Sequence, residues 1–477
     1  MSEAKNSNKI LSILVLGTLM SALDGTVVLL ALPSLTSDLN TNLVASIWII
    51  LSYILVTAVA TTQLGRIGDI FGRSRMFNLG FVIFTVGSAL CGLAPNINYL
   101  NLFRIIQAVG GSLLAATSGA IIADTFEANK RGHAFGYLAV GWSAGAMLGI
   151  VLGGVLTTFF GWRYIFYINI PIGIIAVFLG LKYIKDNPTI SAKLDIVGML
   201  LMGTGLVSLS LGAVDFASQG YAISNEALVA FGVALLAVFL FWEKKARSPI
   251  LHLQAFKNRV LTASILASLF QSLGYFSVTF ILIMYLQGIR GLNPLDASLL
   301  LIPGYIVSSF VGPYMGKLSD KIGARTIATV GILLMCIAVT VYLTLTTTTS
   351  LYVIVAATVI SGFGISMFFP ANNSAVMSNT EEGHYGSISG LLRTTANIGT
   401  IGSYVLLLTA ATAGISRNVA FQVFVGTSNL IGGVSSSFLA GLKTALYLCL
   451  FFLVIAGILS ALRGKENRDG IARKQRR

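Results

Sequence analysis

Residues 65–73 read GRIGDIFGR and residues 316–323 read GKLSDKIG, so glycine, aspartate and glycine recur with the same offsets at two distant points. Both stretches are charged, short and wedged between long apolar segments. One glycine–aspartate loop is compatible with an ordinary tight turn, but two copies in equivalent places indicate an internal duplication. The sequence therefore predicts two related halves.

The segments around these loops predict a polytopic membrane protein. Of the 477 residues 55% are hydrophobic and 10% are charged, whereas soluble domains carry about 25% charged residues. A helix needs about 20 apolar residues to cross a bilayer. Counting such stretches predicts an all-α protein with fourteen transmembrane helices: 10–32, 45–64, 77–94, 99–123, 134–159, 164–184, 196–215, 227–243, 260–286, 296–313, 326–346, 351–377, 386–411 and 438–462.

The positive charges predict the orientation of these helices. With an even number of spans, both termini lie on one side of the membrane. If that side is the cytoplasm, 25 of the 31 Lys and Arg residues fall in cytoplasmic loops and tails and four in outer loops, as the positive-inside rule requires. We expect a multi-pass cell-membrane protein with cytoplasmic termini. Its net charge of +14 would suggest nucleic acid in a soluble protein, but the charges lie in membrane loops and form no basic stripe interleaved with exposed aromatics, so no nucleic-acid partner is expected.

The repeat also predicts the domain organisation. Each copy lies between the second and third helices of a six-helix set, which gives a first half at 1–185 and a second half at 260–462. Two further helices form an insert at 186–259, and a basic tail follows at 463–477. Parallel halves of this kind hold substrate near the midplane between them and work by rocking.

Two charges inside the predicted spans point to the mechanism. Asp24 and Arg104 each interrupt an apolar run, and a charge at the bilayer centre costs about 2.5–3.5 kcal/mol on insertion scales. Burial disfavours a charged carboxylate, whereas a nearby guanidinium favours it. A cycle that changes their separation can load and unload a proton. A static ion pair that fixes the first helix to the fourth is the alternative.

At these motifs the chain resembles the major facilitator superfamily, and specifically its 14-helix drug:H⁺ antiporter branch. The resemblance covers essentially the whole chain and rests on matching positions in the first loop motif, the first and fourth helices and two later strings: Gly65, Asp69, Gly72, Arg73, Arg75, Leu23, Asp24, Thr26, Ala31, Leu32, Pro33, Arg104, Gln107, residues 162–166 and residues 169–173. The chain departs from the pattern at Leu29, at Ala108 and at Ile150, where antiporters of the branch carry a proline.

The resemblance implies that Asp24 couples transport to protons and that Arg104 relays them. The loops are expected to control gating, with Asp69 facing a helix of the other half and Arg73 bracing the loop. The gating residues so predicted are Gly65, Asp69, Gly72, Arg73 and Asp320, together with Gly145, Gly149 and Gly153. These last three, with Gly141, recur every four residues and form a bare stripe for close helix packing.

Substrate recognition is predicted from aromatic and amide side chains in the second half, because a lipophilic or amphiphilic molecule needs apolar walls with a few polar groups. The candidates are Gln271, Tyr275, Phe369, Asn372, Asn373 and Asn397. Simple helix packing is the alternative for them. Arg393 is expected to pair with Asp320, Glu381 or Glu382, or to reach the interface.

These features predict a monomeric, proton-driven efflux antiporter for lipophilic or amphiphilic small molecules, and not an enzyme. No nucleotide-binding loop or metal-ligand motif occurs in the sequence, so no cofactor or metal is expected. Ile150 keeps open a symporter or an exporter of one metabolite, and a non-transporting receptor or scaffold is the rival from another class. Residues 412–437 are expected to form either a partly buried hairpin or a disordered loop.

Overall fold

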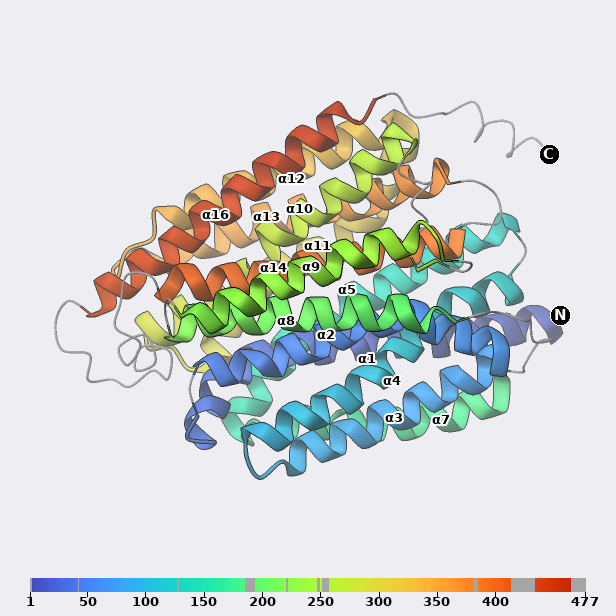
Figure 1. The fold of residues 1–477 in the computed structure, drawn as a ribbon, viewed down its shortest axis with the longest axis horizontal. Helices are drawn as coiled ribbons and strands as arrows, with labels where there is room; N and C mark the ends of the chain where they lie inside the picture. The colour runs from blue at the N-terminus through green and yellow to red at the C-terminus, as the bar shows by residue number, and fades with distance from the viewer. Residues whose placement is uncertain are drawn as a thin grey trace.

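The structure is a computed structural model that describes residues 2–41, 43–126, 128–184, 194–219, 222–246, 249–250, 257–380, 385–412 and 434–464. Within these ranges the regular elements are helices (Figure 1). The predicted hairpin or loop at 412–437 and the tail at 463–477 fall almost entirely outside them. The first and last helices place both chain ends at one end of the bundle, called here the termini end, and the opposite end is called the far end.

The helices follow the predicted spans closely. The first half contains α1 (Ser2–Asp38), α2 (Leu43–Phe71), α3 (Arg73–Leu93), α4 (Ile97–Thr125), α5 (Ala128–Phe159), α6 (Tyr164–Tyr167) and α7 (Asn169–Tyr183). Next come α8 (Ile196–Gln219) and α9 (Ile223–Glu243). The second half contains α10 (Arg259–Ile283), the π-helical turn η2 (Met284–Ile289), α11 (Pro294–Ile322), α12 (Ala324–Leu343), α13 (Leu351–Ser378), α14 (Tyr385–Thr412) and α16 (Val434–Leu462).

A helix occupies each of the fourteen predicted segments, but the number of spans is confirmed only in part. Among the described residues, twelve helices are long and apolar enough to cross a bilayer, or thirteen if the bent pair in α2 is one span. The helix left out is α14, which carries Arg393, Asn397 and several threonines. The chain is therefore an all-helical membrane protein, and fourteen spans remain a prediction.

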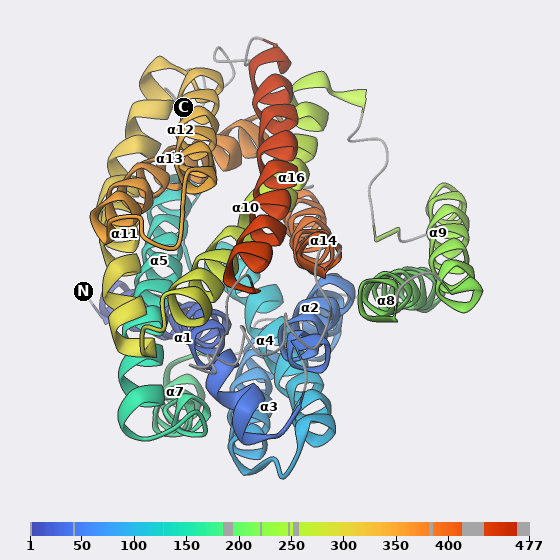
Figure 2. The ribbon, with the colours of Figure 1, turned by 90° about the vertical axis from the view of Figure 1, so that its left-hand side faces the viewer.

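The helices gather into two groups that meet along two seams. Within the first group α1 packs on α5 and α3 on α4, and within the second α13 packs on α11 and α12. The groups meet where α5 contacts α11 and where α2 contacts α14. Figure 2 shows α8 and α9 at the side, where α8 contacts both α2 and α14. These contacts fit the predicted halves and insert, a division that we keep as a proposal.

The two loop motifs have equivalent geometry. Gly72 and Gly323 each join the second helix of a group to the third, with φ of 105° and 108°, a region that residues with a side chain rarely adopt. The first glycines correspond as well, because a Cβ on Gly65 would lie 3.5 Å from Ala116 of α4 and one on Gly316 would lie 3.5 Å from Pro370 of α13. The sequence repeat is thus a structural repeat.

The glycine stripe of α5 packs against α1, as the sequence predicts for close helix packing. A Cβ on Gly141 would meet Val15, and one on Gly153 would lie 3.0 Å from the carbonyl oxygen of Val27. At Gly149 it would overlap the Thr26 hydroxyl and lie 2.6 Å from the Leu23 carbonyl oxygen. Backbone cannot yield as a flexible side chain can, so these glycines fix the distance between the two helices.

We expect Gly149→Val to force α1 away from α5 and to cost about 1–3 kcal/mol of stability, as overpacking does. The measurement is the thermal midpoint of the purified protein in detergent. Gly25→Ala is the matched control on the facing helix, because a Cβ there meets nothing within 4 Å. Equal midpoints for the two variants would show that the stripe does not set the helix spacing.

Candidate functional site

The two predicted intramembrane charges meet in the first half. Arg104 Nη1 of α4 lies 2.6 Å from Asp24 Oδ2 of α1, and both side chains are almost fully buried, at 2% and 0% exposed. Helix α4 begins at an Asn96 cap whose side chain accepts from the backbone N–H groups of Asn98 and Tyr99, which fixes its start. The structure therefore places the pair inside the bundle, as the sequence predicts.

Two amides complete the shell around the carboxylate. Gln107 Nε2 donates to Asp24 Oδ1 at 2.8 Å, and Asn169 Nδ2 donates to the same oxygen at 3.3 Å. Asn169 also donates to Ser88 Oγ, whose hydroxyl donates to the Phe166 carbonyl oxygen. Asp24 thus joins helices α1, α3, α4 and α7 in one buried polar network.

Arg104 is held by further groups. Its Nη1 also donates to Gln107 Oε1 at 2.8 Å, and its Nε donates to the Ile49 carbonyl oxygen at 3.1 Å. The guanidinium lies 4.5 Å from the centre of the Tyr53 ring, at the range of a cation–π contact. These contacts make Arg104 the link between α1, α2 and α4.

Gln107 and Asn169 are motif positions in the sequence, but neither they nor Ser88 are predicted from it to contact Asp24. Gln107 follows Arg104 by three residues, which puts both side chains on one face of a helix, and this spacing could have identified it. Nothing in the sequence brings Asn169 and Ser88 to Asp24, because that contact depends on how α3 and α7 pack.

The first loop motif forms a chain of charges within its own half. Arg73 Nε lies 2.7 Å from Asp69 Oδ1, and Arg73 Nη1 lies 2.7 Å from Asp124 Oδ1. The predicted bracing by Arg73 has this geometry, whereas the described bonds of Asp69 do not reach the second half. The side chain of Asp320, its counterpart in the repeat, lies outside the described residues.

Arg66 of the first loop motif contacts the chain at both ends of the α8–α9 insert. Its Nη2 donates to the Pro249 carbonyl oxygen at 2.7 Å, and the carboxylates of Asp195 and Glu243 lie close enough to act on it. Asp195 also accepts from Trp242 Nε1 at 2.9 Å. Arg66 therefore attaches the α8–α9 insert to α2.

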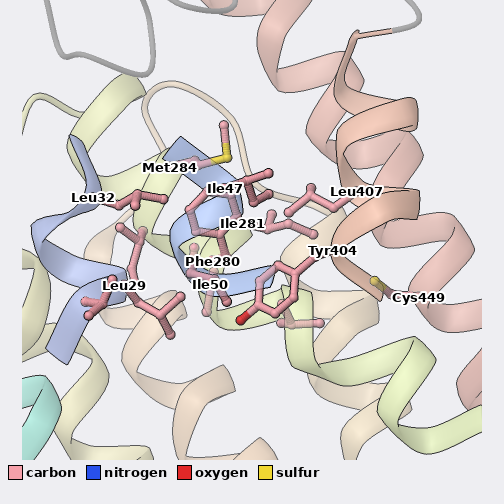
Figure 3. Packing of buried hydrophobic residues seen from close by; sticks show 14 of the residues in the cluster. Leu29, Leu32, Ile47, Ile50, Phe280, Ile281, Met284, Tyr404, Leu407 and Cys449 are labelled. Carbon is pink, nitrogen blue, oxygen red and sulfur yellow. The ribbon is translucent and has the colours of Figure 1, made fainter. Parts of the chain in front are cut away.

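An apolar plug closes the space between the halves toward the far end. It combines residues of α1, α2, α10, η2 and α14 (Figure 3), namely Leu29, Leu32, Ile47, Ile50, Phe280, Ile281, Met284, Tyr404 and Leu407, which are at most 5% exposed. Gln287 Nε2 adds a buried bond across the halves, 3.2 Å to the Leu30 carbonyl oxygen. The far end is closed in this structure.

The six predicted substrate residues lie on three helices of the second half, α10, α13 and α14. Gln271 is buried with its Nε2 3.7 Å from Met335 Sδ, and Asn372 Nδ2 donates to the Ser264 carbonyl oxygen at 3.1 Å. Both are contacts inside the second half, as the packing alternative expects. Tyr275 and Phe369 are partly buried, with Phe369 against Phe368. Asn373 is exposed and Asn397 is partly buried.

With this geometry established, comparison with known proteins shows the family. Residues 14–404 match the profile described as Major Facilitator Superfamily, so the chain belongs to this superfamily. The family and the names of relatives indicate a transporter, and not an enzyme.

Two relatives and one solved structure illustrate the kinds of transporter to which the chain is similar. Riboflavin transporter RibZ of Clostridioides difficile (strain 630) is 34% identical over 390 residues, 80% of this chain and 84% of the relative. Multidrug transporter protein MdtP of Bacillus subtilis (strain 168) is 30% identical over 451 residues, 92% and 82% of the two chains. A bacterial homologue of the human lysosomal transporter Spinster, solved inward-facing and unoccupied, shares the fold with a TM-score of 0.65 at 18% identity, covering 98% of each chain.

We expect Asp69→Asn to weaken the Asp69–Arg73–Asp124 chain and to make the space between the halves more accessible from the termini end. The readout is the labelling rate of a cysteine introduced by Asn397→Cys, with Glu226→Gln on the exposed face of α9 as a charge-neutralising control. An unchanged labelling rate in Asp69→Asn would contradict a gating role for this loop.

Proposed function

We propose that the protein is a proton-coupled efflux antiporter of lipophilic or amphiphilic small molecules that works by alternating access. The observation that carries the proposal is the buried Asp24–Arg104 pair with its amide shell. A buried ion pair adds little stability over well-packed apolar residues, and an intramembrane charge at this depth is costly. Its presence in a transporter fold is therefore best explained by a task in transport.

The geometry supports a specific proton cycle. Asp24 accepts three hydrogen bonds, from Arg104, Gln107 and Asn169, and such donors stabilise the charged carboxylate. The donors stand on α4 and α7, whereas the acceptor stands on α1. A movement that separates α1 from these helices removes the donors and leaves the carboxylate in an apolar setting, where the protonated form is favoured. Return of the helices expels the proton.

The closed far end supports the alternating-access part of the proposal. The plug joins α1 and α2 to α10 and α14, so rocking of one half against the other opens it as a unit. We propose from the distribution of the positive charges that the termini end is cytoplasmic, so that the structure corresponds to a state closed toward the outside. We further propose fourteen spans, a cell-membrane location and a monomer.

A transporter of one metabolite is the second candidate, because a relative at 34% identity is named as a riboflavin transporter and Ile150 stands where antiporters of the branch carry proline. The two candidate functions differ in the range of substrates that the protein would transport. Reconstituted vesicles under an imposed pH gradient should accumulate several unrelated amphiphilic dyes if the proposal is correct. Accumulation of riboflavin and of none of the dyes would favour the second candidate instead.

We expect Asp24→Asn to abolish accumulation against a gradient while downhill flux survives, because asparagine cannot exchange a proton. The structure adds a stability cost of about 1–3 kcal/mol, since one of the three donors around Asp24 would face the new NH₂ group. Both fluxes are measured in reconstituted vesicles, and thermal stability is measured on the purified protein.

Asp38→Asn is the matched control on the same helix, because Asp38 also pairs with an arginine, Arg163 at 2.8 Å, but is 53% exposed. Asp38→Asn should leave proton-driven accumulation of the substrate intact. A static Asp24–Arg104 bridge predicts a different result for Asp24→Asn, with a loss of about 3–5 kcal/mol and an equal decline of uphill and downhill flux. Uphill transport that persists in Asp24→Asn would exclude Asp24 as the coupling residue.

A further inference from the structure

Arg393 of α14 is a cation inside the helical bundle whose position the proton cycle does not explain. Its side chain is exposed, yet the guanidinium lies among protein atoms dense enough to desolvate it. A side chain that is exposed to solvent but surrounded by many protein atoms typically lines an internal cavity. Eight residues separate it from the start of α14, which places it about 12 Å into the bundle from the termini end at 1.5 Å per residue.

The turn of α14 shows which way Arg393 faces. At 100° per residue, positions 393, 397 and 404 fall on one face of a helix. Tyr404 of that face lies in the central plug, against Phe280. The sides of α14 that pack on neighbours carry other residues, since Thr394 bonds to Ala58 of α2 and Gly399 packs on Leu269 of α10. Arg393 and Asn397 therefore face the axis between the halves, on the termini side of the plug.

Helix α1 also borders open space on the termini side of the plug. Gly25 of α1 is exposed although its neighbours Leu23 and Asp24 are buried, and a Cβ added to it would meet nothing within 4 Å. Gly25 precedes Leu29 of the plug by one helical turn, about 6 Å. Open space thus lies beside Gly25, one turn from the plug on its termini side.

The charge that borders this space is positive. Asp24 and Arg104 neutralise each other at 2.6 Å, and they are buried. Within the part of the chain that the structure describes, Arg393 has neither an ion pair nor a hydrogen bond. Among the described residues, Arg393 therefore contributes a positive charge that no described carboxylate neutralises, and such a charge repels lipophilic cations and attracts anions.

We infer that Arg393, with Asn397 one turn away, forms a subsite for an anionic group, so that the substrates are amphiphilic anions such as carboxylates, sulfonates or phosphates with an apolar body. The inference rests on the proposed transport function and narrows its substrate class. The guanidinium supplies paired donors to the anionic group, and the apolar plug supplies the surface for the body of the molecule. A charge-assisted hydrogen bond of this kind changes affinity by roughly ten- to a hundredfold.

The first test measures the charge of the subsite without any transport. The three native cysteines are replaced by serine, and Asn397→Cys is labelled with a sulfonate-bearing and an ammonium-bearing methanethiosulfonate of similar size. Both rates are divided by those of a free thiol. The sulfonate reagent should be favoured, and this preference should fall roughly tenfold when Arg393→Gln is added. Arg393→Lys should keep it.

Lys317→Gln is the matched control, because it removes an exposed cation of α11 and should leave the preference unchanged. An unreactive cysteine at 397 would show that this face does not border open space, and an equal preference with and without Arg393 would show that its charge is compensated. Either result overturns the inference. Neither depends on proton coupling, so the proposed function is tested separately.

The second test measures binding of two dyes with one xanthene body and opposite charge. Fluorescein, an anion, should bind the purified protein at least tenfold more tightly than rhodamine 123, a cation, by fluorescence anisotropy. Arg393→Gln should remove most of this preference, and Arg393→Glu should reverse it. Tighter binding of rhodamine 123 by the unmodified protein, or binding of neither dye, would overturn the proposed substrate class.

Discussion

The cost of holding a charge in an apolar bundle is the constraint on which the rest of the structure depends. Asp24 can be buried only because Arg104 neutralises it and two amides occupy its remaining oxygen, and Arg104 can be buried only because it also reaches the Ile49 carbonyl oxygen and the Tyr53 ring. The network therefore sets how α1, α2, α4 and α7 lie relative to one another.

The two sides of α1 have different physical character, and this difference suits a moving helix. One side lies on the glycines of α5, where backbone meets backbone and the spacing cannot change. The other side carries Asp24, the open space at Gly25 and the plug residues Leu29 and Leu32. Apolar contacts such as those of the plug are non-directional, so the plug can separate and form again without a defined hydrogen-bond geometry.

Hydropathy was enough to locate fourteen helices, and the rarity of intramembrane charge was enough to identify Asp24 and Arg104, because both signals are local in the sequence. The repeat likewise gave Gly72 and Gly323 their shared backbone conformation. What could not be predicted depends on helix rotation and packing. The residue types of Gln271 and Asn372 could not reveal their contacts with Met335 and Ser264. Asn169 and the plug are assembled from distant segments, and the polar residues of α14 lower its hydropathy below that of a candidate span.

The position of α8 has a consequence for molecules dissolved in the bilayer. Of the two seams between the halves, the α2–α14 seam is covered by α8, whereas no other described helix lies across the α5–α11 seam. A lipophilic molecule that partitions into the membrane thus meets a protein with one shielded flank and one bare flank. Helix α8 therefore separates the α2–α14 seam from the surrounding lipid. The two extra helices make an otherwise pseudo-symmetric protein laterally one-sided.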